Sequence, residues 1–359
     1  MIEKRQWKKA MILMACIGLG MGSKSVGAAT YTTPILSGSP TFVGGDVVDI
    51  NGANQFGIKL WSAGELMTTT GKLDFDFTTT LLPTSTIEAI SLKNGGLNTL
   101  GTGSEFTVVT ASTVTYPAAG LVLGKQGSNM TSASGSNLTL TMNGQGGQYG
   151  ILGQGHLNLG ANSKVDITSV VSSAVGINLG GGNVNASDLM VNVNGKTSAT
   201  GMYMTQTNTT LTGQNNSVTA KSGGNSVSGL WIDGGASGVS NFNVERMDIN
   251  VEAASLGDTQ GIFAYMKDNF INLGSGSTIT TKNAMGVNLS ATAADPTPVN
   301  STFTADKLTI ATTGAGAYGI ISYYGWTASL TDSTITTNGI NAHGLLLAGG
   351  ATNNITNSV

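Results

Sequence analysis

Short alternations of apolar and polar residues fill the chain from about residue 30 onward. In Leu138–Met142 and Met247–Val251, for example, every second residue is apolar. Such alternation places the apolar side chains on one face of a β-strand. Apolar residues at the 3.6-residue helical spacing are scarce, because Gly, Thr and Asn interrupt almost every window. The pattern predicts an all-β protein.

The alternating segments also recur at a nearly regular interval. A small residue followed by an apolar residue, any residue and usually a second apolar residue returns every 25 to 33 residues. We call the small residue the anchor. The anchors are Gly57, Ala89, Gly120, Gly150, Gly176, Gly201, Gly229, Gly261, Gly286, Gly319 and Gly344.

A repeat of this length with two or three strands and no helix is typical of one coil of a parallel β-helix. We therefore predict a right-handed β-solenoid of about ten to eleven coils, with anchor-plus-one residues such as Ile58, Leu121 and Ile177 stacked inside it. The anchor glycine would supply a special backbone angle or a close approach at a corner. A tandem of β-sandwiches or a β-propeller is the competing architecture, although propeller blades need four strands.

Composition supports many turns and short strands. Charged residues make up 10% of the chain and Gly contributes 52 of the 359 residues, yet apolar residues reach 40%, so the low-hydrophobicity signature of disorder is absent. The net charge is −3, and Lys and Arg do not cluster after residue 24. We therefore expect no nucleic-acid partner.

The N-terminus has the pattern of a secretory signal peptide over residues 1–28. Lys4, Arg5, Lys8 and Lys9 precede the apolar run 10–22, and small residues follow it. Cleavage would remove five of the 16 basic residues, one of the 19 acids and the only cysteine, leaving a net charge of −7. A lipid anchor on Cys16 is the alternative. The remaining domain, 29–359, would fold without disulfide bonds.

The signal segment, the cysteine-free domain and the glycine-anchored coils between Asn/Thr/Ser-rich loops resemble the passenger domain of bacterial autotransporters of the pertactin-like type. The resemblance rests on pattern and composition over roughly residues 30–359. It implies a right-handed parallel β-helix, export, and passage through the outer membrane by a C-terminal β-barrel. It also implies a role in surface adhesion, with no catalytic motif carried over.

The sequence departs from this family in one respect. A barrel would show as a series of ten-residue alternating strands, and no such series follows the coils. The chain ends 15 residues after Gly344, about half a coil. We therefore expect the array to stop in mid-coil as a truncated passenger, with membrane contact only through a missing barrel.

Two histidines and two acidic pairs are the candidate polar sites. Gly153–His156 weakly resembles the glycine–histidine element of pectin-degrading β-helices, and His343 directly precedes an anchor. Both histidines lack an obvious catalytic partner, so we expect surface residues. The acidic pairs Asp46/Asp49 and Asp74/Asp76 could serve acid–base chemistry or Ca²⁺ binding. They lack a basic cluster, so we expect solvated faces, no metal, no cofactor and no catalytic residues.

The strongest candidate contact site lies two residues after the anchors. Tyr203, Trp231 and Phe263 occupy this outward position in three consecutive coils, and Leu152, Ile321 and Leu346 occupy it in others. Stacked coils would align the aromatic rings as a stripe. Such a stripe either docks a ligand or stabilises the stack beneath a covering loop, and the 32-residue step after Gly229 is long enough for such a loop.

These observations together predict a non-enzymatic, exported rod of the autotransporter passenger type, at the cell surface, in the outer membrane or outside the cell. Its partner would be a host surface glycan or protein, or another copy of the rod. A β-helical polysaccharide lyase or hydrolase and a secreted self-associating filament module are the alternatives. The lyase would need clustered carboxylates and basic residues in one groove.

Overall fold

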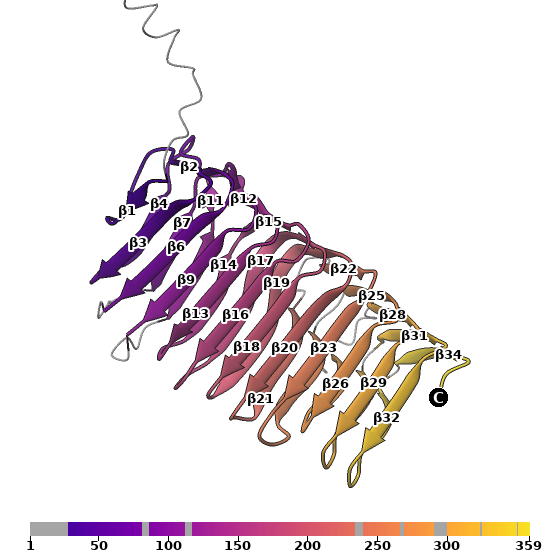
Figure 1. Ribbon diagram of the computed structural model, residues 1–359. Coiled ribbons are helices and arrows are strands. Elements are labelled where there is room, and N and C mark those ends of the chain that lie inside the picture. Colours follow the sequence, from indigo (N-terminus) through magenta and orange to yellow (C-terminus); the bar gives the residue numbers. More distant parts are fainter. Residues whose placement is uncertain are drawn as a thin grey trace, which may run out of the picture.

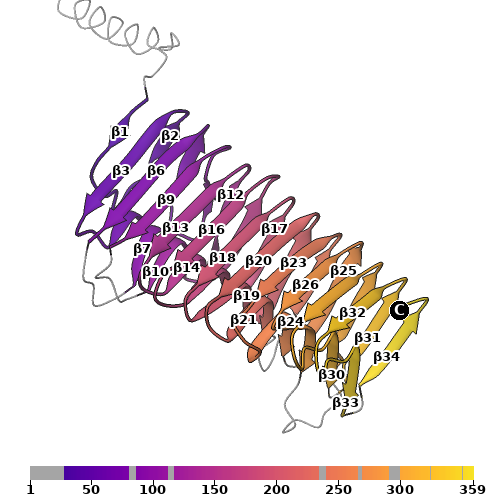
Figure 2. The same cartoon turned by 60° about the horizontal axis from the view of Figure 1, so that its bottom comes forward.

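A computed structural model of the chain describes residues 28–80, 86–111, 117–233, 240–265, 269–290, 300–323, 325–349 and 351–359, without the side chains of 206–209. The described chain forms an elongated parallel β-solenoid, in which strands lie side by side in chain order along the rod (Figures 1 and 2). It contains no helix within these residues. The predicted signal segment 1–28 lies outside them except for its last residue.

Each coil contributes one strand to each of three parallel sheets. The first sheet consists of β1 (Thr30–Tyr31), β3 (Asp46–Gly52), β6 (Leu73–Thr79), β9 (Glu105–Thr110), β13 (Thr139–Gly144), β16 (Lys164–Ser169), β18 (Met190–Gly195), β20 (Asn216–Ser222), β23 (Met247–Glu252), β26 (Thr278–Lys282), β29 (Thr309–Thr313) and β32 (Thr334–Asn338).

The next sheet around the coil carries the anchors, and we call it the anchor sheet. It consists of β4 (Phe56–Leu60), β7 (Ile87–Leu92), β10 (Ala118–Leu123), β14 (Gln148–Gly153), the first halves of β17 (Ala174–Ala186) and β19 (Ser198–Gly213), β21 (Ser226–Asp233), β24 (Asp258–Tyr265), β27 (Met285–Ser290), β30 (Ile320–Tyr323) and β33 (Leu345–Ala348).

The third sheet completes the coil and joins the anchor sheet through the corner-crossing strands β17 and β19. It consists of β8 (Leu97–Thr99), β12 (Asn129–Gly135), β15 (Gly155–Leu159), the second halves of β17 and β19, β22 (Ser240–Val244), β25 (Asn269–Ser275), β28 (Thr302–Asp306), β31 (Thr327–Thr331) and β34 (Thr352–Thr356). At the N-terminal end of this face, β2 (Thr41–Val43) and β5 (Thr68–Thr70) form a separate parallel pair. The short β11 (Lys125–Gln126) pairs antiparallel with β12.

The core confirms the predicted apolar stack. The anchor-plus-one residues are in register from Ile58 to Leu345, so that Met202, for example, lies between Ile177 and Leu230. Ile58, Ile177 and Leu230 are fully buried. Because each inward side chain rests on its counterpart in the next coil, the coils share one continuous hydrophobic core.

Close packing explains the anchor glycines. The anchor is skipped in the pairing of neighbouring strands. Thr200 and Met202 each have a register partner in β21, whereas Gly201 has none. A Cβ on Gly201 would lie 2.1 Å from Val218 Cγ1 and 2.6 Å from the Gly229 carbonyl oxygen. Of the two reasons predicted for the anchor glycine, the close approach is confirmed, whereas a special backbone angle is not needed because Gly201 lacks a positive φ. Glycine is needed at this corner for space.

The corner between the third and first sheets turns through a left-handed residue. Asn137, Asn162, Asp188 and Asn215 have φ between 50° and 61° there. Asparagine and aspartate tolerate this conformation better than other side chains. These residues account for part of the high Asn content of the sequence.

Candidate functional site

The aromatic side chains predicted from the sequence lie on the outer face of the anchor sheet. Tyr203 in β19 is paired in register with Trp231 in β21, which is paired with Phe263 in β24. Each lies between two inward, buried neighbours of its own strand. The strand alternation therefore turns the three rings outward, and the parallel register aligns them along the rod. We call Tyr203, Trp231 and Phe263 the aromatic stripe.

The rings of the aromatic stripe contact one another edge to face. The centroids of Tyr203 and Trp231 are 5.4 Å apart, and those of Trp231 and Phe263 are 4.9 Å apart. Tyr265 stacks on Phe263 with centroids 6.0 Å apart, which extends the aromatic surface. All four side chains are half-buried. The arrangement forms a contiguous aromatic patch on the exterior, and edge-to-face pairs of this kind also stabilise the stack.

The surroundings of the stripe reduce the solvation of its polar atoms. Burial raises the pKa of the Tyr203 hydroxyl, and the nearby Asp233 and Tyr149 act in the same direction. Trp231 Nε1 has almost no accessible surface and no hydrogen-bond partner among the described residues. An interaction with the stripe would therefore use ring surface more than hydrogen bonds. The suggested covering loop includes residues 234–239, which lie outside the described part of the chain.

The apolar residues at the same position in other coils differ in exposure. Leu152 and Leu346 are half-buried, whereas Ile321 is only 4% exposed. Polar residues adjoin the aromatic stripe, since Asn178 pairs with Tyr203 and Asn288 with Phe263. The exterior aromatic patch is therefore confined to three central coils.

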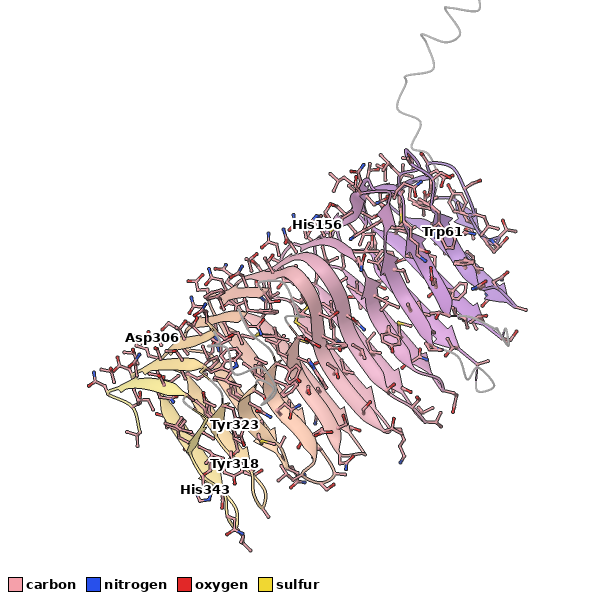
Figure 3. All side chains as sticks on the ribbon, turned by 180° about the vertical axis from the view of Figure 1, so that it is seen from behind. Trp61, His156, Asp306, Tyr318, Tyr323 and His343 are labelled. Carbon is pink, nitrogen blue, oxygen red and sulfur yellow. The ribbon has the colours of Figure 1, made fainter. Side chains whose placement is uncertain are left out.

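The two histidines lie on different sides of the rod (Figure 3). His343 is exposed and stacks on Tyr318, with centroids 5.4 Å apart, in the variable position before the anchors. His156 lies on the third sheet, where its Nδ1 accepts a hydrogen bond from the Asn183 backbone N–H at 3.2 Å. Neither histidine forms an ion pair with an acid within the described residues.

The acidic pairs are only partly the solvated faces expected. Asp46 is 2% exposed, and its carboxylate accepts hydrogen bonds from the backbone N–H groups of Ala29 and Val43 at 2.8 and 2.9 Å. That expectation was wrong for Asp46 because a spacing of three residues puts Asp46 and Asp49 on opposite faces of β3. Asp74 is outward and forms an ion pair with Lys72 at 3.0 Å.

A second exterior aromatic side chain, not predicted from the sequence, lies near the N-terminal end of the anchor sheet. Trp61 is 38% exposed, and the Nζ atoms of Lys59 and Lys93 lie 4.0 and 4.4 Å from its ring centroids. Trp61 Nε1 donates to Ser91 Oγ at 2.8 Å. Lys93 also forms an ion pair with Glu88. These contacts fix Trp61. Trp61 and Lys93 each lie four residues after their anchors, Gly57 and Ala89, and this shared position was the sequence signal that could have revealed the contact between them.

The described residues contain no group of three or more His, Cys, Asp or Glu side chains placed to hold a metal ion. Within the same residues no helix is long and apolar enough to span a bilayer. No protein-family model, curated protein or solved structure matches the chain. The chain is therefore assigned to a fold, the parallel β-solenoid, and to no family. This fold is compatible with a passenger-type β-helix.

Proposed function

We propose that this chain is an exported, non-enzymatic rod of the autotransporter passenger type, which acts in adhesion at the cell surface. The observation that carries the proposal is the aromatic stripe: three contiguous, half-exposed rings on the outside of a rigid parallel stack. Contiguous apolar surface of this kind usually marks a contact with another molecule. The segment 1–28 supports export through its signal-peptide pattern.

The rod would present its contact surface without a conformational change. Parallel strands and a continuous core fix the backbone beneath Trp231 on both sides. A preformed surface loses little conformational entropy on binding. The partner of the stripe would be a host surface glycan or protein, bound through the ring faces and edges.

Adhesion of beads coated with the purified chain to epithelial cells tests this function. Trp231→Ser removes the central ring, and we expect bead adhesion to fall several-fold while the β-type circular dichroism spectrum is retained. Phe270→Ser is the matched control, since Phe270 is a 39% exposed aromatic residue on the third sheet, away from the stripe. Unchanged adhesion of the Trp231 variant, or an equal loss in the Phe270 variant, would contradict the proposal.

A further inference from the structure

A groove lies on the third sheet beside the only antiparallel pair among the described strands. Lys125 and Gln126 of β11 pair with Met130 and Asn129 of β12, and Gly127 begins the two-residue turn with φ 61°. This short hairpin projects from the coil, and all of its residues from 125 to 129 are exposed. The space beside it is an open groove of about 730 Å³, which we call the hairpin groove.

Glycines keep one wall of the hairpin groove free of side chains. Gly180, Gly181 and Gly182 form the corner within β17 that faces the hairpin, and the last two have φ of 83° and 101°. A Cβ on Gly182 would lie 2.0 Å from the Gly155 carbonyl oxygen, so no larger residue fits without moving the backbone. The width of the groove is therefore built into the coil.

Two side-chain acceptors in the groove already accept hydrogen bonds from the protein, which leaves the N–H donors of the same side chains available to a ligand. His156 Nδ1 accepts the Asn183 backbone N–H, so in the neutral ring Nε2 carries the proton and acts as a donor. Asn183 Oδ1 accepts the Thr210 hydroxyl at 2.8 Å, which leaves the Asn183 amide N–H groups as donors. Lys125 adds an exposed ammonium group that forms no ion pair within the described chain.

The charge of the groove differs from that of the chain as a whole. The lining contains Lys125 and His156 but neither Asp nor Glu. The complete chain has a net charge of −3. A donor-rich, acid-free groove on an acidic rod is complementary to an anionic ligand that is rich in oxygen atoms.

We propose that the hairpin groove binds an acidic oligosaccharide whose sugar rings carry carboxylates. Lys125 pairs with a carboxylate, and His156 Nε2 donates to a carboxylate or hydroxyl oxygen. The neutral groups of Asn129 and Asn183 hydrogen-bond ring hydroxyls, and Met130 offers apolar contact at the hairpin base. The groove is larger than a single carboxylate requires, which favours a sugar chain over a small inorganic anion.

Isothermal titration of the purified chain with trigalacturonic acid tests this site. Its carboxyl-reduced counterpart, α-1,4-galactotriose, is the neutral control, and sodium phosphate is the small-anion control. We expect binding of the acidic trimer, no measurable binding of the neutral trimer, and no displacement by an equal concentration of phosphate. Binding should weaken as salt is added, because the Lys125 ammonium is exposed.

Two substitutions in the groove and one control elsewhere test whether the groove side chains bind the ligand. Lys125→Gln removes the ammonium group and should weaken binding about fivefold, as expected for an exposed charge pair. His156→Asn keeps an acceptor for the Asn183 N–H but removes the Nε2 donor, whose position the shorter amide does not reach, and should weaken binding by a similar factor. Lys164→Gln changes the net charge equally on the first sheet, where Lys164 pairs with Asp166, and should have no effect.

Four results would overturn the proposal: no binding of the acidic trimer at millimolar concentration, equal binding of the neutral trimer, displacement by equimolar phosphate, or equal effects of all three substitutions. Binding in solution does not require the aromatic stripe. The titration can therefore fail while the bead-adhesion result stands, and the reverse also holds.

Discussion

Met247 and Ser277 lie in adjacent coils, and the Met247 backbone N–H donates a hydrogen bond to Ser277 Oγ at 2.9 Å. Both residues are fully buried at the corner that leads into the first sheet. Ser277 Oγ in turn donates to the Leu273 carbonyl oxygen at 2.6 Å. A single hydroxyl thus satisfies two buried backbone groups and ties one coil to the next.

The same relationship recurs along the corner. A Ser or Asn side chain of one coil accepts the N–H of an apolar residue in the preceding coil. The pairs are Leu73 with Ser104, Leu138 with Ser163, Leu189 with Asn216, Met247 with Ser277, and Leu308 with Ser333. Without these side chains, the buried N–H groups would lose their partners.

Replacing Ser277 by Ala should therefore destabilise the rod. The change leaves the Met247 N–H and the Leu273 carbonyl without this partner, so we expect a loss of about 1–3 kcal/mol in the free energy of unfolding. Urea denaturation followed by circular dichroism measures the loss. Thr280→Ala, at an exposed outward position of β26, is the control and should change stability by less than about 0.5 kcal/mol. Equal stabilities of the two variants would contradict the role assigned to Ser277.

A methyl group at an anchor tests the packing argument directly. Gly201→Ala places a Cβ against Val218 and the Gly229 carbonyl oxygen, so we expect a loss of about 1–3 kcal/mol from overpacking. Gly147→Ala is the matched control, because its Cβ would have its nearest neighbour, Ser173 Oγ, at 3.6 Å. Thermal unfolding should show a lower midpoint for the Gly201 variant alone. A midpoint within one degree of the unsubstituted protein would show that the corner can expand.

The anchor repeat made the solenoid and the aromatic stripe predictable from the sequence. Once Gly201, Gly229 and Gly261 are aligned, the register of the parallel strands follows, and so do the neighbours of Trp231. The burial of Ile321 at the same position was not predictable, since the strand alternation alone places it outward like Trp231.

Other features could not be predicted because the sequence patterns that indicate them are short or do not recur in every coil. At the corner that leads into the first sheet, one coil has an apolar residue and the next has Ser or Asn, as with Leu308 and Ser333. No single residue type therefore recurs at this position in every coil. The hairpin at Lys125 has only two paired residues per strand, and only the Gly127–Ser128 dipeptide indicates it. The buried Asp46 depends on contacts with Ala29 and Val43 that the spacing of the acids does not reveal.

Lys307 occupies the left-handed corner position that Asn holds in several other coils, with φ 50°. A lysine is strained in this conformation, whereas glycine is not. Its Nζ lies 3.9 Å from the Asp306 carboxylate, a long and exposed contact that contributes little. Lys307→Gly should therefore raise the free energy of unfolding by about 0.5–1 kcal/mol. A lower stability in urea denaturation would show that the lysine side chain supports the corner.

Glu252 joins three coils by accepting from Lys282 at 2.7 Å and Lys221 at 3.2 Å. Its hydrogen bonds to Lys282 and then Lys221 hold the pKa of the carboxyl below its usual value. A depressed pKa in the folded state means that the contribution to stability is present above the unfolded pKa of about 4.3 and is lost as pH falls through the lower folded value.

Glu252→Gln should therefore lower stability at pH 7, and the difference should shrink as pH falls toward 2 and the carboxyl of the unsubstituted protein becomes protonated. Urea denaturation of both proteins across this pH range measures the difference. High salt at pH 7 should shrink the difference, because the three side chains are exposed to solvent. Asp306→Asn is the control, since its Lys307 contact is long, and its effect should show little dependence on pH. A Glu252 effect that persists unchanged at pH 2 would mean that the carboxylate charge does not act through the two lysines.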